Sequence, residues 1–350
     1  MSLLKEIFTL NKSRSDEFCT PVARDARTLY SSKHPTEMLV FKCMDGRINL
    51  PLITRVPMGM LHPFRHIGGK FLLGDPYLGR LVLDAKETAI HEGRSTLALC
   101  TYHFSKGNTH RGCAGHNYDT QSARDGAFAL KKEFEEVFGV PNQAISAIVI
   151  GIETDEDVLI FSSEDGQELN MREYTQATDD QIRAKLFSLY PNLTHQMLND
   201  LLPLALGNRA HVASERTQTR PNIELVHNEN IICVGRGFDW LHLPNRALII
   251  GPYGHFDNTW REAVVVAGNI VLDNFRKNEA LSRDGALLLV SAPYTHMQER
   301  GLAIAKAKYF AMVAKKVLQP LTQELKFESL VGVTDMETMR YHPLSEERAS

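Results

Sequence analysis

Several features that would point to particular protein classes are missing from this 350-residue sequence. No apolar run approaches the roughly 20 residues that a membrane span needs, and the start, Met1-Ser-Leu-Leu-Lys-Glu, lacks the layout of a signal peptide. The formal net charge is only -3, so the composition provides no strongly basic surface for nucleic acid or an anionic membrane. We therefore expect a cytoplasmic protein with neither nucleic acid nor a membrane as partner.

Cysteine is scarce as well. The five cysteines stand at positions 19, 43, 100, 113 and 233, an odd number spread widely over a long chain. Such a distribution does not indicate a disulfide framework, so metal binding is the more useful question. A composition of 43% hydrophobic and 23% charged residues is ordinary for a globular protein, and the length allows two domains.

Three chemically active side chains follow an apolar run early in the chain. Residues 38–43 read as a buried strand that ends at Cys43, and Asp45 and Arg47 follow at alternate positions. With the period of two of an extended chain, the three side chains would lie on one side, so that carboxylate and guanidinium can pair beside the sulfur. In open α/β sheets this carboxyl edge is where ligands bind.

A second chemical cluster follows the next predicted strand. Residues 96–102 read as a buried strand, and His103, His110, Cys113 and His116 come after it, before a predicted helix over 122–138. Together the two clusters offer two thiols and at least one imidazole, the ligand types that tetrahedral zinc prefers. A third protein ligand with an open fourth position would make a catalytic zinc site.

The arrangement resembles the β-class carbonic anhydrases. The resemblance is carried by Cys43-x-Asp45-x-Arg47 after one strand and by the histidine and cysteine after the next. Between them, the stretch from Arg65 to Gly68 is similar to an Arg-Asn-x-Gly segment of that family. The fold class it implies is α/β, a β-carbonic-anhydrase-like sheet flanked by helices.

The second half of the sequence looks like a decayed copy of the first. Residues 230–236, with Cys233, are similar to residues 40–47, and residues 287–293 end sixty residues after Cys233, as His103 lies sixty after Cys43. A duplicated chain with one degenerate half is most like the carboxysome shell branch of the family, and it implies an internal pseudo-dimer that can dimerise again into a homodimer. The amino-terminal extension of those shell enzymes has no counterpart here, which leaves packaging with carboxysome components open.

From these features we predict four segments. They are an amino-terminal arm (1–37), a zinc-bearing catalytic domain (38–206), a polar linker (207–221) and a degenerate domain with a carboxy-terminal tail (222–350).

The resemblance also implies a reaction and a role for each residue. Zinc held by Cys43, His103 and Cys113 would lower the pKa of bound water to about 7, and the hydroxide would convert carbon dioxide reversibly to bicarbonate. Asp45, held by Arg47, would orient that hydroxide, although in some family members the matching aspartate binds the zinc and blocks it.

The histidine ligand has two candidates. His110-x-x-Cys113 has the spacing of ordinary β-class enzymes, whereas His103 matches the longer gap of the shell branch. We prefer His103, because a strand end fixes an imidazole better than a glycine-containing loop does. His110 and His116 would then be hydrogen-bonding groups near the metal or proton shuttles.

Simpler interpretations stand beside these. Arg65 can merely bind local carbonyl groups, Gly68 can be a turn residue, and Asp45 with Arg47 can be a structural ion pair. The alternative functions are a non-catalytic zinc-binding scaffold or shell protein, in which His110 closes the coordination, and a zinc hydrolase of another small linear substrate such as carbon disulfide.

Overall fold

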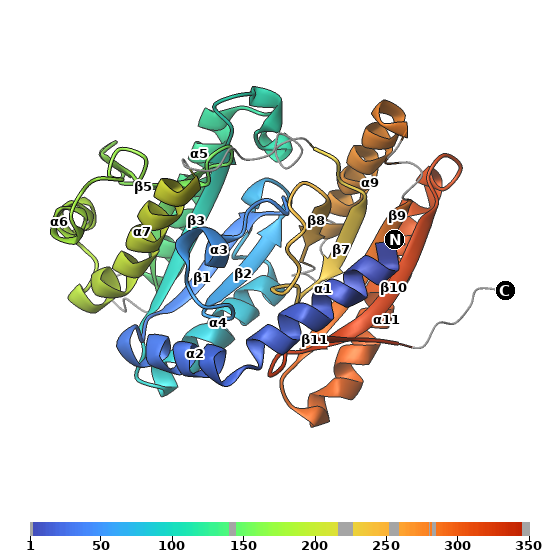
Figure 1. The fold of residues 1–350 in the computed structure, drawn as a ribbon, viewed down its shortest axis with the longest axis horizontal. Coiled ribbons are helices and arrows are strands. Elements are labelled where there is room, and N and C mark those ends of the chain that lie inside the picture. Colours follow the sequence, from blue (N-terminus) through green and yellow to red (C-terminus); the bar gives the residue numbers. More distant parts are fainter. Residues whose placement is uncertain are drawn as a thin grey trace. The chain divides into compact units, whose positions relative to one another are not determined.

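The computed structural model describes residues 3–139, 145–215, 227–251, 259–279, 281 and 285–344 (Figure 1). The chain forms two compact units, which we call unit A and unit B. Unit A comprises Asp25–Met44 and Ile48–Val226, and unit B comprises Met1–Arg24, Asp45–Arg47 and His227–Ser350. Three residues of the early cluster, from Asp45 to Arg47, therefore belong to unit B although the flanking chain belongs to unit A.

Unit A is built on a six-stranded sheet in the order β2-β1-β3-β4-β5-β6. Its strands are β1 (Glu37–Cys43), β2 (Leu61–His66), β3 (Thr96–Phe104), β4 (Ser146–Glu153), β5 (Val158–Ser162) and β6 (Glu168–Asn170). The strands β2, β1, β3 and β4 run parallel, and β5 and β6 continue the sheet antiparallel. Because β1 and β3 are adjacent and parallel, their carboxyl ends meet at one edge of the sheet.

Helices connect and cover this sheet. They are α2 (Pro21–Lys33), α3 (Leu50–Thr54), α4 (Pro76–His91), α5 (Thr120–Phe138), α6 (Asp179–Leu189) and α7 (His195–Glu215), with short 3₁₀ turns at Ile67–Gly69, Thr109–Arg111 and Ala114–His116. Helix α5 packs against β3 and β4, and its apolar face meets an aromatic cluster in which Phe41 lies 5.0 Å from Phe134 and 4.7 Å from Phe64, ring centre to ring centre. This buried cluster holds β1 in place beneath the strand end that carries Cys43.

Unit B is built on a second sheet, in the order β11-β10-β9-β7-β8. Its elements are β7 (Ile231–Gly235), β8 (Ala247–Ile250), α9 (Thr259–Lys277), β9 (Ala286–Tyr294), α11 (Arg300–Leu318), β10 (Phe327–Asp335) and β11 (Arg340–Pro343), with 3₁₀ turns at Met297–Glu299 and Gln319–Leu321. Helix α11 packs against β9 and β10, and α9 packs against β7 and β8. The strands β8, β7, β9 and β10 are parallel, and β11 is antiparallel.

The two sheets share one topology. The order β8-β7-β9-β10 repeats the order β2-β1-β3-β4, with parallel pairing throughout. In unit B, however, the strand neighbours of Cys233 are the aliphatic residues Ile249 and Leu289. The α/β class with sheets flanked by helices is confirmed, and the internal duplication and pseudo-dimer remain predictions that this shared strand order supports.

The predicted linker begins inside a helix. Helix α7 runs on to Glu215, so residues 207–215 are helical, while residues 216–226 lie outside the described part of the chain. The reason is close packing, because a Cβ atom on Gly207 would lie only 1.7 Å from the carbonyl oxygen of Thr54. This glycine lets α7 approach the α3 segment. The polar stretch that suggested a linker includes Asn208, whose buried side chain donates to the carbonyl oxygens of Ile53 and Asp157.

The chain ends also differ from expectation. The predicted amino-terminal arm forms the helices α1 (Leu3–Phe18) and α2, and within unit B α1 lies against β11 (Figure 1). Asn11 holds it there, since its side chain donates to the carbonyl oxygen of Met339 and accepts from the backbone N–H of Tyr341. Near the predicted carboxy-terminal tail, the described residues up to 344 include the end of β10 and all of β11.

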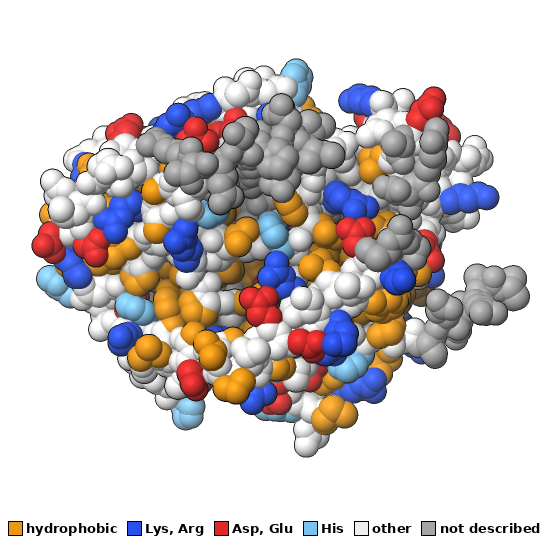
Figure 2. Space-filling model, in the orientation of Figure 1, with side chains coloured by type: hydrophobic (Ala, Val, Ile, Leu, Met, Phe, Trp, Pro, Cys, Tyr) orange, Lys and Arg blue, Asp and Glu red, His pale blue; other side chains and the backbone are white. Residues whose placement is uncertain are grey.

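Charges of both signs are interspersed over the face seen in Figure 2, as the small net charge suggested. Of the helices that the structure describes, none is both long and apolar enough to cross a membrane.

Candidate metal centre

Three buried side chains converge at the carboxyl edge of the unit A sheet. Cys43 ends β1, His103 stands at the end of β3, and Cys113 follows the loop after β3. Their exposed fractions are 6%, 2% and 3%, and their potential ligand atoms all lie within 4.8 Å of one another. Neighbouring parallel strands thus deliver an imidazole and a thiol to one point, and the following turn adds a second thiol.

The donor set and its spacing fit zinc. The two sulfur atoms lie 3.8 Å apart, and neither cysteine forms a disulfide. Two thiolates bound at about 2.3 Å to one tetrahedral zinc ion would lie about 3.8 Å apart, whereas a disulfide would need about 2.05 Å. The residues present can therefore hold a zinc ion through two sulfurs and one nitrogen.

The structure places the two candidate histidines differently. His103 belongs to the group of three, whereas His110 lies in the 3₁₀ turn Thr109–Arg111, exposed, with its ring 5.2 Å from that of Tyr118. Among the described residues, the group has three members and no fourth histidine, cysteine or acidic ligand.

His116 is buried beside this group and is fixed at both ring nitrogens. Its Nε2 lies 3.0 Å from the carbonyl oxygen of Gly68 and its Nδ1 lies 3.1 Å from the hydroxyl of Ser122. Burial lowers the pKa of His116, with the hydrogen bond to Gly68 acting in the opposite direction. Gly68 adopts φ 65°, as its predicted role as a turn residue requires, and Arg65 donates to the carbonyl oxygen of Ile48 at 2.9 Å.

Two acidic residues that we did not single out from the sequence anchor the loop after His103. Asp155 accepts hydrogen bonds from the hydroxyl of Ser105 and the backbone N–H of Gly107, and Glu153 accepts from the backbone N–H of Lys106. Burial raises the pKa of Glu153, and the backbone donors partly offset this. The sequence did contain a signal for them, because Glu153 and Asp155 stand at the end of β4, the strand beside β3, which carries His103.

Asp45 and Arg47 form a buried ion pair within unit B. The Arg47 guanidinium donates through Nε at 3.1 Å and through Nη2 at 2.6 Å to the carboxylate of Asp45, and the backbone N–H of Arg47 donates to the same group at 2.9 Å. The backbone of Gly46, between them, donates to the carbonyl oxygen of Ala247, where a Cβ atom would clash. Both carboxylate oxygens of Asp45 are thus engaged by Arg47.

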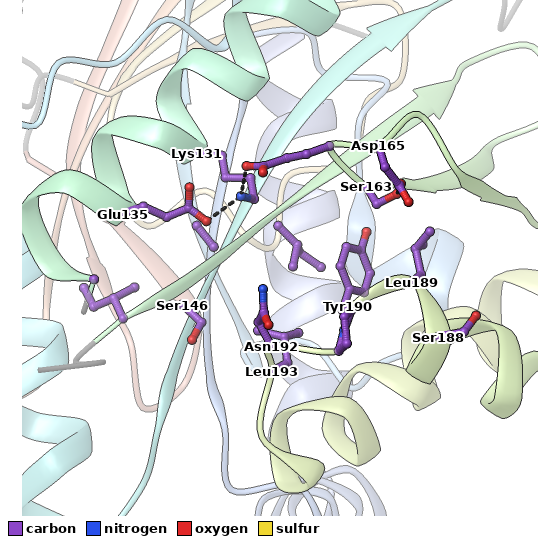
Figure 3. A pocket seen from close by; sticks show the side chains of 16 residues that line it. Lys131, Glu135, Ser146, Ser163, Asp165, Ser188, Leu189, Tyr190, Asn192 and Leu193 are labelled. Carbon is purple, nitrogen blue, oxygen red and sulfur yellow. Dashed lines mark hydrogen bonds and ion pairs between the residues drawn. The ribbon is translucent and has the colours of Figure 1, made fainter. Parts of the chain in front are cut away.

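A pocket of about 740 Å³ lies elsewhere in unit A (Figure 3). It is lined from Lys131, Ser146 and Tyr190, and Lys131 pairs there with Glu135 and Glu164. Ser146 begins β4, so this pocket is at the amino end of the parallel strands, the opposite edge from His103. It contains none of the three candidate ligands.

Fold and site together define an α/β protein with a candidate zinc centre of two cysteines and one histidine at the carboxyl ends of parallel strands. Residues 32–229 match the family model described as "Carboxysome Shell Carbonic Anhydrase, catalytic domain". This stretch is more than half of the chain and includes every candidate residue of the centre. The chain belongs to the carboxysome shell carbonic anhydrase family.

Two curated relatives are similar to parts of this chain. The carboxysome shell carbonic anhydrase of Hydrogenovibrio crunogenus is 28% identical over 130 residues, which are 33% of this chain and 24% of that protein. The carboxysome shell carbonic anhydrase of Halothiobacillus neapolitanus is 26% identical over 267 residues, 64% of this chain and 51% of that protein. The chain therefore spans about a quarter and about half of the lengths of these relatives.

Proposed function

We propose that this protein catalyses the reversible hydration of carbon dioxide to bicarbonate with a zinc ion held by Cys43, His103 and Cys113. The observation that carries the proposal is the buried group of two thiols and one imidazole within 4.8 Å, in a chain of a carbonic anhydrase family. When bound at such a site, zinc lowers the pKa of a coordinated water to about 7 and so supplies a nucleophile at neutral pH.

Two side chains of the protein, Asp45 and Arg47, would orient the nucleophile. Asp45 follows the ligand Cys43 by two residues, so the chain carries this carboxylate next to the proposed centre. Held by Arg47, Asp45 would accept a hydrogen bond from the nucleophile and direct it towards the carbon of carbon dioxide. The ion pair between Asp45 and Arg47 supports the orienting role that we propose for this carboxylate.

The proton released in each turnover must reach solvent. His110 is exposed in the loop between the two later ligands, and an imidazole titrates near neutral pH, so we assign the shuttle to His110. His116 is buried and bonded at both nitrogens, which suits a positioning role beside the centre better than proton transfer.

A non-catalytic zinc scaffold would need a closed coordination shell. Three members in the described part of the group, with His110 outside it, support an open fourth position and therefore catalysis.

The test is stopped-flow hydration of carbon dioxide by reduced, zinc-quantified protein at about pH 7 and about pH 8.5. We expect activity that Cys113→Ser abolishes together with bound zinc. Asp45→Asn should keep the zinc and lower kcat, since it removes only the orienting charge. An inactive wild-type protein with one zinc per chain would overturn the proposal and favour the scaffold.

We also propose that the chain works with carboxysome components in the cytoplasm and that its two halves arose by duplication. The names of the relatives and the shared strand order support these points. Failure of the protein to sediment with carboxysomes isolated from its source cells would contradict the first. Sedimentation equilibrium tests the predicted homodimer.

A further inference from the structure

A series of hydrogen-bonded polar groups in unit B, some buried and some half-buried, ends at the Asp45–Arg47 pair. Nη2 of Arg47 lies 3.4 Å from Nε2 of His227, and Nδ1 of His227 lies 2.5 Å from Oε1 of Glu229. The other carboxylate oxygen of Glu229 accepts a hydrogen bond of 2.9 Å from the side-chain amide of Asn274 in α9. Asn274 also donates to the backbone carbonyl of Glu229, so the glutamate is held at both side chain and backbone.

The chemistry of these groups determines which atom donates and which accepts in each of these hydrogen bonds. A guanidinium only donates hydrogen bonds, so a neutral His227 that bonds to Arg47 must accept at Nε2 and carry its proton on Nδ1. That proton then points at Glu229, which selects this tautomer and ring orientation. Glu229 thus orients His227, and His227 in turn bonds to Arg47, as a carboxylate often orients a histidine in metal sites.

Burial of Glu229 helps this carboxylate to hold the His227 ring in place. Glu229 is almost completely buried, with an exposed fraction of 1%, and its charge is met by His227 and Asn274. A buried, fully engaged carboxylate does not reorient at low cost, because moving it would leave its own charge without hydrogen-bond donors. The Nη2 group of Arg47 is thus held by both Asp45 and His227.

We propose that Glu229 is a positioning residue, acting through His227 to hold Arg47, and thereby Asp45, in the geometry that orients the attacking nucleophile. This inference rests on the proposed carbonic anhydrase function. It also gives the second half of the chain a task, because His227, Glu229 and Asn274 all lie beyond the residues that supply the candidate zinc ligands. The second half of the chain would thus supply the support for the Asp45–Arg47 pair.

The test compares Glu229→Gln with wild-type full-length protein at equal zinc content. The amide keeps an acceptor near His227 but removes the charge that fixes its ring. We expect kcat to fall roughly 10- to 100-fold, the usual effect of losing a group that orients a metal-site residue, with KM for carbon dioxide nearly unchanged. Asn274→Ala, which leaves the charge in place but loosens it, should give a smaller loss in the same direction.

Asp157→Asn is the matched control. Asp157 and His211 form another buried carboxylate–histidine pair, 3.2 Å apart, in unit A, and its loss should leave kcat within about twofold.

A second readout does not depend on activity. In protein labelled with ¹⁵N-arginine, the Nε–H of Arg47, assigned from Arg47→Lys, should exchange slowly with water in the wild type. It should exchange at least about tenfold faster in Glu229→Gln. Unchanged exchange in the folded variant would overturn the proposal. A wild type that binds zinc but does not hydrate carbon dioxide would refute the proposed function, while the exchange rates would still decide whether Glu229 positions Arg47.

Discussion

Gly115 allows two backbone segments of the candidate metal centre to approach more closely than a side chain would permit. A Cβ atom on this residue would lie 2.6 Å from both the Cα and the N of Gly68. The contact brings the turn after Cys113 against the turn after β2, and it places His116 where its ring reaches the carbonyl oxygen of Gly68. One missing methyl group therefore sets the position of the loop that carries the second thiol.

Gly115→Ala should both destabilise the protein and weaken the metal centre. The added methyl group meets backbone, which cannot rotate away, so we expect a loss of about 1–3 kcal/mol in the free energy of unfolding. Zinc should also transfer faster to a chelator, because Cys113 lies two residues before the substituted position. Gly74→Ala is the control, since nothing lies within 4 Å of a Cβ atom there, and it should be close to neutral. Equal behaviour of the two variants would contradict the role given to Gly115.

At this scale, the sequence indicates which residues carry chemistry but not what holds them. A strand that ends in a thiol or an imidazole is visible in the pattern of residues 38–43 and 96–103, because burial and period leave a signal. Glu153 and Asp155 are 47 and 48 positions away from the loop residues that they hold. Glu229 is two residues from His227, but His227 is 180 positions away from Arg47. No spacing rule connects such residues, so their roles emerge only when the sheet brings the elements together.

The ends of helices and strands can be predicted from the sequence where they depend only on residues close in the chain. The predicted helix over 122–138 agrees with α5 because its cap and apolar period are local. The boundary at 207 failed because Gly207 serves helix packing, and a glycine in a polar stretch looks the same in a linker. The strands β10 and β11 were not predicted from the sequence, because the pairing of β10 with β9 is a long-range contact.

Strand β1, which delivers Cys43, is clamped at its other end by charge. Glu37 is buried and pairs with His62 of β2 at 2.8 Å and with Arg94, just before β3, at 2.5 Å. Burial alone would raise the pKa of Glu37, but the hydrogen bonds and charges of His62 and Arg94 outweigh it and lower the pKa below its ordinary value of 4.5. The clamp thus joins the three strands whose far ends form the site edge.

Because the folded pKa of Glu37 is depressed, its ionised form stabilises the fold above about pH 4.5, and this contribution is lost as pH falls through the folded pKa. We expect Glu37→Gln to lower the unfolding free energy by about 1–3 kcal/mol near pH 7, with the difference from wild type shrinking below about pH 4.5. Urea unfolding at a series of pH values measures this. Glu92→Gln, at the exposed partner of Arg94, should change stability by less than about 0.5 kcal/mol. A difference that is independent of pH would contradict the assignment.

On the scale of the whole molecule, two sheets with the same strand order differ in their chemistry. Around Cys233, the aliphatic neighbours Ile249 and Leu289 take the strand positions that adjoin a chemical site in unit A. Thiols among aliphatic groups are packing residues rather than ligands. Because all three candidate ligands belong to unit A, we expect metal binding to stabilise unit A directly and unit B only indirectly.

Removal of zinc should consequently separate the unfolding of the two units. A ligand that binds only the folded state stabilises it by about 2.7 kcal/mol at a hundred times its Kd, so chelation should lower the Tm of unit A by roughly 5–10 °C. The two tryptophans of the sequence, Trp240 and Trp260, are both buried in unit B, so tryptophan fluorescence reports that unit alone. We expect calorimetry to show a transition that moves with chelation and returns with added zinc, while the fluorescence transition stays in place. A fluorescence transition that shifts by the same amount would show that the two units unfold as one cooperative structure.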